Sequence, residues 1–177
     1  ADDAAGVKTL LPFPVPAGVT RCPGNMGARN FPAGAYSPST HRYYLPIVDT
    51  CMGKQGDTPA RFLALGLTTL EFAWDIKTRV PQSSAALTTA GGLLFSATPD
   101  RYFRALDDRT GKVLWESPRL NDIPNAFPIS YMVDGKQYIA MPVGNTGLQG
   151  NTALGTAPEL GAVRGASSSI LWVWQLP

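Results

Sequence analysis

The chain has 177 residues and a formal net charge of +2, and only 16% of its residues are charged. This length fits one domain, the charge provides no basis for nucleic-acid binding, and no apolar run reaches the roughly 18 residues of a membrane span. With 18 glycines, 16 prolines and 44% hydrophobic residues, the composition predicts a packed, loop-rich protein and excludes a disordered chain or a long helical bundle.

The predicted elements are short β-strands separated by turns. Residues 1–35 show no helical period and are expected to be mostly loop, with an irregular segment at 1–20. Asp134-Gly135 between two later apolar runs is a strong hairpin signal. Many short strands with frequent turns predict an all-β protein. The expected strands are Arg42–Ile47, Arg61–Ala64, Phe72–Ile76, Leu93–Ala97, Tyr102–Leu106, Val113–Glu116, Ile129–Val133, Gln137–Met141 and Ile170–Gln175.

An eleven-residue pattern occurs twice. Residues 64–74 read ALGLTTLEFAW and residues 105–115 read ALDDRTGKVLW, so both fit Ala-Leu-x-x-x-Thr-x-x-x-x-Trp. Trp74 and Trp115 lie 41 positions apart, and a period of about 40–45 residues with several strands is the size of one propeller blade. The alternative is a pair of unrelated hairpins, which the agreement in spacing and residue type disfavours.

The residues of the second copy are suited to form a tight turn. Asp107 and Thr110 can bond the backbone of the turn, and Gly111 can take a positive φ. Trp115 is then expected to close the hairpin and offer a flat face to the next blade. In the first copy, Gly66 and Leu70 stand at the positions of the aspartate and the turn glycine, which predicts a degenerate turn there.

Cys22 and Cys51 are the two cysteines of the chain. With no Cys-x-x-Cys and one histidine, a zinc site is excluded, which leaves a disulfide or two buried thiols. A disulfide would contribute about 3–4 kcal/mol in the chain-entropy model and imply an oxidising compartment. The start at Ala1 without a leader is expected to be a processed end, either a mature N-terminus or an internal cut.

Four motifs resemble one protein family. The pattern at 105–115 is similar to the tryptophan-docking motif of PQQ-dependent dehydrogenases, which are eight-bladed β-propeller quinoproteins. TAGGLLF at 89–95 and DGKQYIA at 134–140 resemble two strands of that family, and GARNF at 27–31 with AYSP at 35–38 resembles a third stretch. The motifs come in the family's order over about residues 20–177, so the chain is identified as a member of the family.

The resemblance implies the C-terminal part of the propeller, about the last two to three four-stranded blades, as one domain over 1–177. In the family, the metal ligands and the catalytic aspartate lie in earlier blades, so this chain is assigned no metal ligand and no catalytic residue. The uncovered sheet faces would need cover. A larger partner chain with the remaining blades is therefore expected, as a separate subunit or the other half of a nicked polypeptide, together with calcium or a lanthanide.

The resemblance also suggests site residues. Asn30 matches an asparagine that hydrogen-bonds PQQ in the family, and an amide can both donate and accept there; the alternative is a turn asparagine. Phe31 stands where the family usually has tryptophan and is expected to wall the cofactor site. Ser83 and Leu148 stand at positions that carry tryptophan in methanol-oxidising or related members, which implies a roomier substrate cavity. The alternative for 144–148 is a surface loop.

The function implied by the resemblance is oxidation of alcohols to aldehydes or ketones by a periplasmic quinoprotein, with electrons passed to a cytochrome-type acceptor. An aspartate of the partner chain would take the alcohol proton, and the metal would polarise the quinone. A non-enzymatic envelope propeller that mediates protein interactions is the alternative, and a stand-alone small β domain is a third class. The absence of Cys-x-x-Cys-His argues against a covalent haem here.

Other charged residues are given structural roles. Asp100, Arg101 and Arg104 are expected to form a solvated strand edge. Asp107 and Asp108 are interpreted as turn residues and not as a carboxylate pair.

Overall fold

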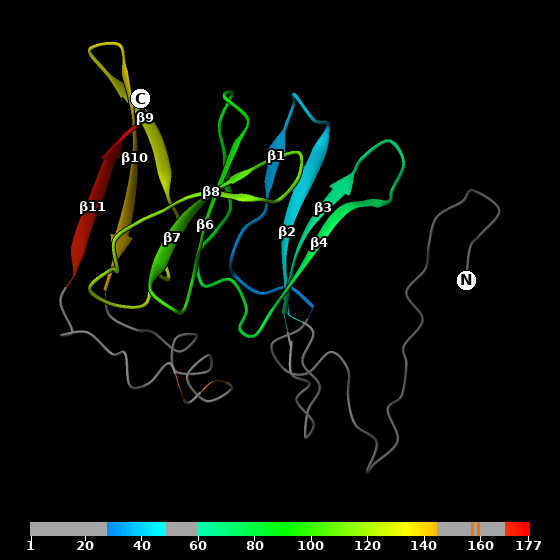
Figure 1. Cartoon of the computed structure of the whole chain (residues 1–177), viewed down its shortest axis with the longest axis horizontal. Helices are drawn as coiled ribbons and strands as arrows, with labels where there is room; N and C mark the ends of the chain where they lie inside the picture. The colour runs from blue at the N-terminus through cyan, green and yellow to red at the C-terminus, as the bar shows by residue number, and fades with distance from the viewer. Residues whose placement is uncertain (1–27, 49–59, 145–156, 158, 160–168) are drawn as a thin grey trace.

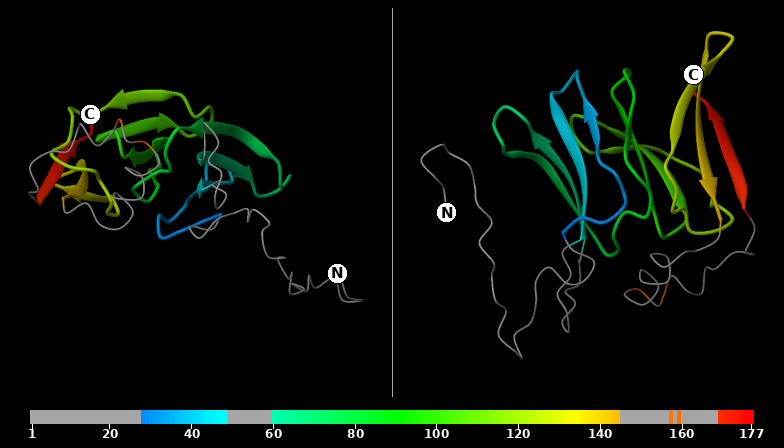
Figure 2. Two further views of the ribbon diagram at one scale, coloured as in Figure 1. Left: turned by 90° about the horizontal axis from the view of Figure 1, so that it is seen from below. Right: turned by 180° about the vertical axis from the view of Figure 1, so that it is seen from behind.

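The protein forms three antiparallel β-sheets. The computed structural model describes residues 28–48, 60–144, 157, 159 and 169–177. Two sheets are four-stranded, in the orders β1-β2-β3-β4 and β5-β6-β7-β8, and the third is three-stranded, in the order β11-β10-β9 (Figure 1). The views of Figure 2 show the sheets side by side with the second sheet between the others. The predicted all-β fold is confirmed for the described residues.

The strands agree closely with the predicted runs, and several extend one or two residues further. The short strands β1 and β5 were not predicted, because two or three residues carry no readable period. The bounds are β1 (Ala35–Ser37), β2 (Arg42–Val48), β3 (Ala60–Gly66), β4 (Phe72–Thr78), β5 (Leu87–Thr88), β6 (Leu93–Thr98), β7 (Tyr102–Asp107), β8 (Val113–Glu116), β9 (Ile129–Val133), β10 (Lys136–Val143) and β11 (Ile170–Gln175).

The core lies in two layers between neighbouring sheets. In β6, Leu94 packs into the layer shared with the first sheet and Phe95 into the layer shared with the third, because successive strand residues point to opposite faces. The second sheet is therefore covered on both faces along β6 and β7, whereas its edge strand β8 is exposed. The first layer contains Tyr44, Phe62, Ala64, Ala86, Leu94 and Leu106, and the second contains Phe95, Ala97, Phe103, Ala105, Leu120, Ile139, Met141 and Val143.

Trp74 connects the first sheet to the turn after β7. A Cβ added at Gly111 would lie 3.0 Å from Cδ2 of Trp74, so the indole ring rests directly on this glycine. The indole Nε1 donates to the carbonyl of Asp108 at 3.2 Å, and the hydroxyl of Tyr44 donates to the same carbonyl at 2.9 Å. The two sheets are thus joined by specific polar contacts as well as by apolar packing.

Asp108 lies in the turn after β7, as predicted, but it is buried. Its Oδ2 accepts a hydrogen bond from the hydroxyl of Ser37 at 2.9 Å. Its carbonyl accepts the two bonds from the first sheet described above. Asp108 therefore lies in the turn, as predicted, and also links the two sheets. Asp107, the last residue of β7, holds the turn: its Oδ1 accepts from the N–H groups of Arg109 and Thr110 at 3.0 and 2.8 Å.

The turn after β3 keeps the geometry of the turn after β7, contrary to the prediction of a degenerate turn. The N–H of Leu70 donates to the backbone carbonyl of Gly66 at 2.8 Å. In the same way, the N–H of Gly111 donates to the backbone carbonyl of Asp107 at 2.9 Å. Leu70 has a φ of 57° and Gly111 a φ of 73°. The backbone therefore imposes a left-handed conformation on a leucine, which such a side chain adopts only at a cost.

We expect Leu70→Gly to stabilise the protein. Leu70 is 73% exposed, so its removal loses little packing, while relief of the left-handed strain is worth about 1 kcal/mol. Chemical unfolding of the variant should show a higher free energy of unfolding. Leu67→Gly, in the same turn without a positive φ, is the control and should destabilise. Equal destabilisation by both substitutions would contradict the strain at Leu70.

The outer face of the third sheet is apolar and exposed. The register places Ile129 and Val173 opposite Ala140, so these side chains share the face turned away from the second sheet. Leu171 and Val133 lie on the same face and are exposed as well. A flat apolar sheet face of this kind is typical of a surface that packs against another layer. In the described part of the chain, no helix has the length and apolarity needed to cross a membrane.

Candidate cofactor and substrate site

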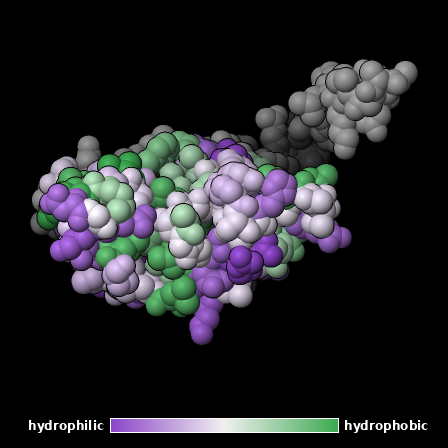
Figure 3. Space-filling view, turned by 90° about the horizontal axis from the view of Figure 1, so that it is seen from above, coloured by the Kyte–Doolittle hydropathy of each residue, from purple (hydrophilic) through white to green (hydrophobic). Residues whose placement is uncertain are grey.

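The chain segments that lead into the first strand of each sheet lie at one end of the molecule, the lower end in Figure 1. We call this end the connection end, and its segments are residues 28–34, 79–86 and 117–128. Tight turns occupy the opposite end, where hydrophilic and apolar residues are interspersed over the surface (Figure 3). The N–H of Ala86 donates to the carbonyl of Ala33 at 2.9 Å. The hydroxyl of Thr88 in β5 donates to Tyr36 in β1 at 2.8 Å. The first strands of neighbouring sheets are therefore adjacent.

Asn30 and Phe31 lie at the connection end and are exposed. The Oδ1 of Asn30 accepts a hydrogen bond from the N–H of Phe31 at 2.8 Å. Phe31 is 40% exposed, and its ring stacks on Phe127 with a centroid distance of 6.1 Å and an interplanar angle of 9°. Phe127, which is 48% exposed, comes from the segment before β9. The pair thus joins the entry segments of the first and third sheets.

Phe127 was not predicted as part of the site. No local spacing connects it to Phe31, because the contact depends on how the three sheets pack. The result is a flat apolar surface beside a side-chain amide. Aromatic faces and a few convergent polar groups are what a planar, polar-edged ligand such as a quinone needs, so the residues present fit such a group.

Ser83 lies deeper than Asn30. It is buried, its N–H donates to the carbonyl of Ala97 at 3.0 Å, and its hydroxyl donates to the same carbonyl at 3.4 Å. The hydroxyl of Ser84 accepts from the N–H of Ala97 at 2.8 Å. These serines fasten the 79–86 segment to β6, and a role of Ser83 in a substrate cavity stays a prediction. Leu148, Cys22 and Cys51 lie outside the described residues.

Trp115 has a more open environment than Trp74. It lies in β8 opposite Ala105, is 38% exposed, and meets Trp174 of β11 edge-on at a centroid distance of 5.7 Å. Trp174 in turn stacks on Phe103 at 5.2 Å. Trp115 therefore contacts the third sheet through a T-shaped pair of rings, whereas Trp74 lies flat on a glycine of its neighbouring sheet.

The charged residues around β7 do not form a solvated strand edge. Arg104 pairs with Asp100 at 2.6 Å and with Glu116 at 2.8 Å, and it also donates to the hydroxyl of Thr98. Burial opposes the charge of Arg104, but its bonds to the two carboxylates outweigh this effect and raise the pKa of the guanidinium. Arg101 donates through Nε to the carbonyl of Leu120 at 2.7 Å. These side chains are therefore structural links.

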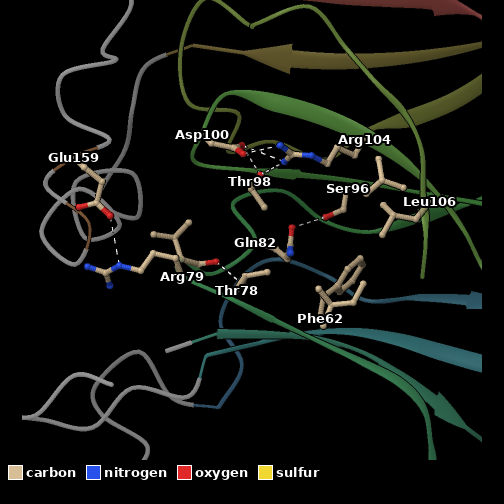
Figure 4. Close-up of a pocket in the computed structure, with 13 residues that line it drawn as sticks. Phe62, Thr78, Arg79, Gln82, Ser96, Thr98, Asp100, Arg104, Leu106 and Glu159 are labelled. Carbon is tan, nitrogen blue, oxygen red and sulfur yellow. Dashed lines mark hydrogen bonds and ion pairs between the residues drawn. The ribbon is translucent and has the colours of Figure 1, made fainter. Parts of the chain in front are cut away.

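A cavity of about 380 Å³ lies between the first and second sheets (Figure 4). We call it the inter-sheet cavity. Gln82 and Ser96 line its middle, and the hydroxyl of Ser96 donates to Oε1 of Gln82 at 3.2 Å. Its lining residues are Phe62, Ile76, Thr78, Arg79, Val80, Gln82, Ser96, Thr98, Asp100, Arg104, Leu106, Val113 and Glu159. Among the residues that the structure describes, no group of three histidine, cysteine or carboxylate side chains could hold a metal ion.

We expect the acid stability of the protein to depend on Asp107. The hydroxyl and N–H of Thr110, with the N–H of Arg109, hold the pKa of this carboxyl below its usual value. A lowered folded-state pKa gives stability that is present above the unfolded pKa of about 3.9 and is lost as the pH falls through the folded value. Asp107→Asn keeps an acceptor but cannot titrate. The denaturant concentration at the unfolding midpoint of this variant should therefore fall less steeply below about pH 4 than that of the wild type. Parallel curves would contradict this role.

Comparison with known proteins places the fold in a family. A model of the β-propeller domain of glucose, ethanol and alcohol dehydrogenases, named for PQQ, matches residues 64–139. The lanthanide-dependent methanol dehydrogenase of Methylacidiphilum fumariolicum (strain SolV) is 30% identical over 68% of this chain and 24% of its own. Lupanine 17-hydroxylase [cytochrome c] of a Pseudomonas species is 31% identical over 72% of this chain and 21% of its own.

A solved structure gives the same result. A europium-containing methanol dehydrogenase superposes with a TM-score of 0.71 and 26% identity, over 90% of this chain and 35% of its own. The chain belongs to the quinoprotein alcohol dehydrogenase family, through the PQQ β-propeller domain of that family. It spans about a quarter of the length of the curated relatives that it matches.

Proposed function

We propose that this chain is the C-terminal part of the propeller of a PQQ-dependent dehydrogenase that oxidises alcohols to aldehydes or ketones. The observation that carries the proposal is the contact of Trp74 with Gly111 and Asp108, which links one sheet to the next in a chain whose relatives are alcohol dehydrogenases. The exposed apolar face of the third sheet supports completion by further blades on a partner chain.

Asn30 and Phe31 would hold the cofactor from this chain, and Ser83 and Leu148 would shape the substrate cavity. When bound, PQQ supplies the acceptor for the hydride that leaves the alcohol. Phe31 and Phe127 would offer the quinone a flat apolar surface, and Asn30 would fix its polar edge. The metal, calcium or a lanthanide, and the catalytic aspartate would lie on the partner chain. The lanthanide-dependent relative and the europium-containing solved structure support a lanthanide.

Electrons would leave to a cytochrome-type acceptor, as the name of the lupanine hydroxylase suggests for that relative. The periplasm is the compartment that we propose, because a disulfide between Cys22 and Cys51 would need oxidising conditions. Cell fractionation and thiol labelling of Cys22 and Cys51 test this part.

Reconstitution tests the enzymatic proposal. The assembly that contains this chain is freed of metal and quinone, and PQQ with calcium or lanthanum is added back. We expect a quinone absorption band and oxidation of primary alcohols with an artificial electron acceptor, both lost again on chelation of the metal. An assembly that binds no quinone under any of these conditions would leave a non-enzymatic envelope propeller as the better account.

A further inference from the structure

The inter-sheet cavity has the dimensions of a ligand site, and the proposed function does not use it. Its volume of about 380 Å³ falls within the roughly 300–1,000 Å³ of small-molecule pockets. Neither Asn30 nor Phe31 lines it. Its walls come from the first two sheets, from the 79–86 segment between them and from Glu159, so this chain supplies all of the residues described around the cavity.

The side-chain amide of Gln82 faces this cavity. Gln82 is only 6% exposed, and its Oε1 is bonded to the hydroxyl of Ser96. Its Nε2 carries two N–H groups and has no hydrogen-bond partner in the described part of the chain, yet it is not sealed from the cavity. Figure 4 shows the side chain in the middle of the lining residues. Water in the cavity can satisfy these N–H groups, and a ligand that brings an acceptor oxygen can replace that water without losing its hydrogen bond.

The apolar end of the cavity lies beyond Gln82. Phe62 and Ile76 contribute from the first sheet, and Leu106 and Val113 contribute from the second. The two sheets thus present facing apolar side chains, with Phe62 and Leu106 at the end of the cavity remote from Glu159 (Figure 4). A ligand that reaches Gln82 with an oxygen can bury an apolar chain against this end.

The charges around the cavity balance one another. Arg104 is committed to Asp100, Glu116 and Thr98, and Arg79 pairs with Glu159 at 3.4 Å. The lining therefore holds two arginines and two carboxylates. A charged ligand would gain no net attraction there and would lose its hydration, so the cavity favours an uncharged ligand.

We propose that the inter-sheet cavity binds an uncharged medium-chain molecule with one oxygen acceptor, such as a ketone, aldehyde or alcohol. The oxygen accepts a hydrogen bond from Nε2 of Gln82. The apolar chain lies against Phe62, Ile76, Leu106 and Val113. Binding needs no quinone, so the proposal is independent of the enzymatic one.

Calorimetric titration tests the proposal on the complete assembly that contains this chain, after removal of its quinone. The probe is methyl hexyl ketone, which has an acceptor oxygen and cannot be oxidised as an alcohol. We expect saturable binding at one site per chain. Octanoate and octylammonium, which have the same chain length and a charge, should bind at least about tenfold more weakly, a difference of about 1.4 kcal/mol.

Two substitutions locate the site. Gln82→Met keeps the side-chain length but removes the donor, and it should weaken ketone binding about tenfold. Val113→Phe fills the apolar end of the cavity and should also weaken ketone binding. Because Val113 is exposed in β8, this variant still tests the site if Gln82→Met does not fold. Gln137→Met is the matched control, because Nε2 of Gln137 bonds Ser130 at 2.8 Å on the surface, and its affinity should equal that of the wild type.

Absence of saturable ketone binding, or unchanged affinity in both Gln82→Met and Val113→Phe, would overturn the assignment of the site. Equal binding of octanoate or octylammonium would overturn the uncharged class of ligand. The absorption spectrum of the same assembly after addition of PQQ is recorded separately. This spectrum reports on the quinone proposal alone, because ketone binding is measured without quinone. Failure of the quinone proposal is therefore distinguishable from failure of the cavity proposal.

Discussion

Trp74→Ala is expected to lower the free energy of unfolding by about 3 kcal/mol, at the lower end of values for large aromatic side chains. The indole contacts Tyr44 at a centroid distance of 5.7 Å and Phe62 at 5.6 Å. It also covers Gly111 and bonds the carbonyl of Asp108. Trp74→Phe keeps most of the packing and removes only the N–H donor, so it should cost about 1 kcal/mol.

Two glycine variants separate the packing of Trp74 from backbone strain. Gly111 and Gly135 have φ angles of 73° and 75°, so alanine at either position costs about 1–2 kcal/mol for its left-handed conformation. Nothing lies within 4 Å of a Cβ at Gly135, whereas a Cβ at Gly111 meets Trp74 at 3.0 Å. Gly111→Ala should therefore cost about 1–3 kcal/mol more than Gly135→Ala.

Chemical unfolding of the complete assembly measures these differences. In the Trp74→Ala background, the additional cost of Gly111→Ala should fall, because the indole ring that the new methyl group meets is gone. Part of the cost should remain, since the methyl group still lies 3.1 Å from Cδ1 of Ile76. Equal costs of Gly111→Ala with and without Trp74 would show that the indole does not rest on this glycine.

Asn30→Ala is expected to weaken PQQ binding about tenfold, the loss of one hydrogen bond of about 1.4 kcal/mol. The variant should fold normally, because Asn30 is exposed and Phe31, whose N–H donates to its Oδ1, is exposed as well. Equilibrium dialysis against PQQ, with detection by quinone absorbance, measures the change without any turnover.

Ser130→Ala is the control for this prediction. Ser130 is an exposed polar residue of β9, outside the connection end, and its replacement should leave PQQ affinity unchanged. Phe31→Ala should weaken PQQ binding as well, because it removes one ring of the pair with Phe127. Unchanged affinity in both Asn30→Ala and Phe31→Ala would place the cofactor away from these residues.

Much of the fold could be predicted from local sequence signals. Strand runs such as Ile129–Val133 and Ile170–Gln175 carry their own apolar and β-branched residues, and the Asp134-Gly135 turn fixes one register. The repeat anticipated that Trp74 and Trp115 occupy equivalent strands. The strands β1 and β5 were not predicted, because they are stabilised by contacts with neighbouring strands. The hydrogen bond from the hydroxyl of Thr88 to the carbonyl of Tyr36 is one such contact.

The candidate site was only partly readable from sequence. Asn30 and Phe31 were suggested by their resemblance to a family motif, but Phe127 and Gln82 depend on contacts between sheets. Asp108 lies in a turn, as predicted, but its buried contact was missed for the same reason, since its partner Ser37 lies 71 positions away. Arg104 and Asp100 look like surface charges in sequence, because their pairing depends on how the second sheet folds. The cavity beside them forms only when that sheet packs against the first.

Native mass spectrometry of the purified assembly, with an absorption spectrum of the same sample, tests most directly whether this chain works as part of a quinoprotein propeller. We expect this sequence to be found together with the remaining blades, with a mass and a near-ultraviolet band that fit PQQ. A folded monomer of 18.9 kDa without any cofactor would contradict the account and would favour a scaffold or a stand-alone β domain.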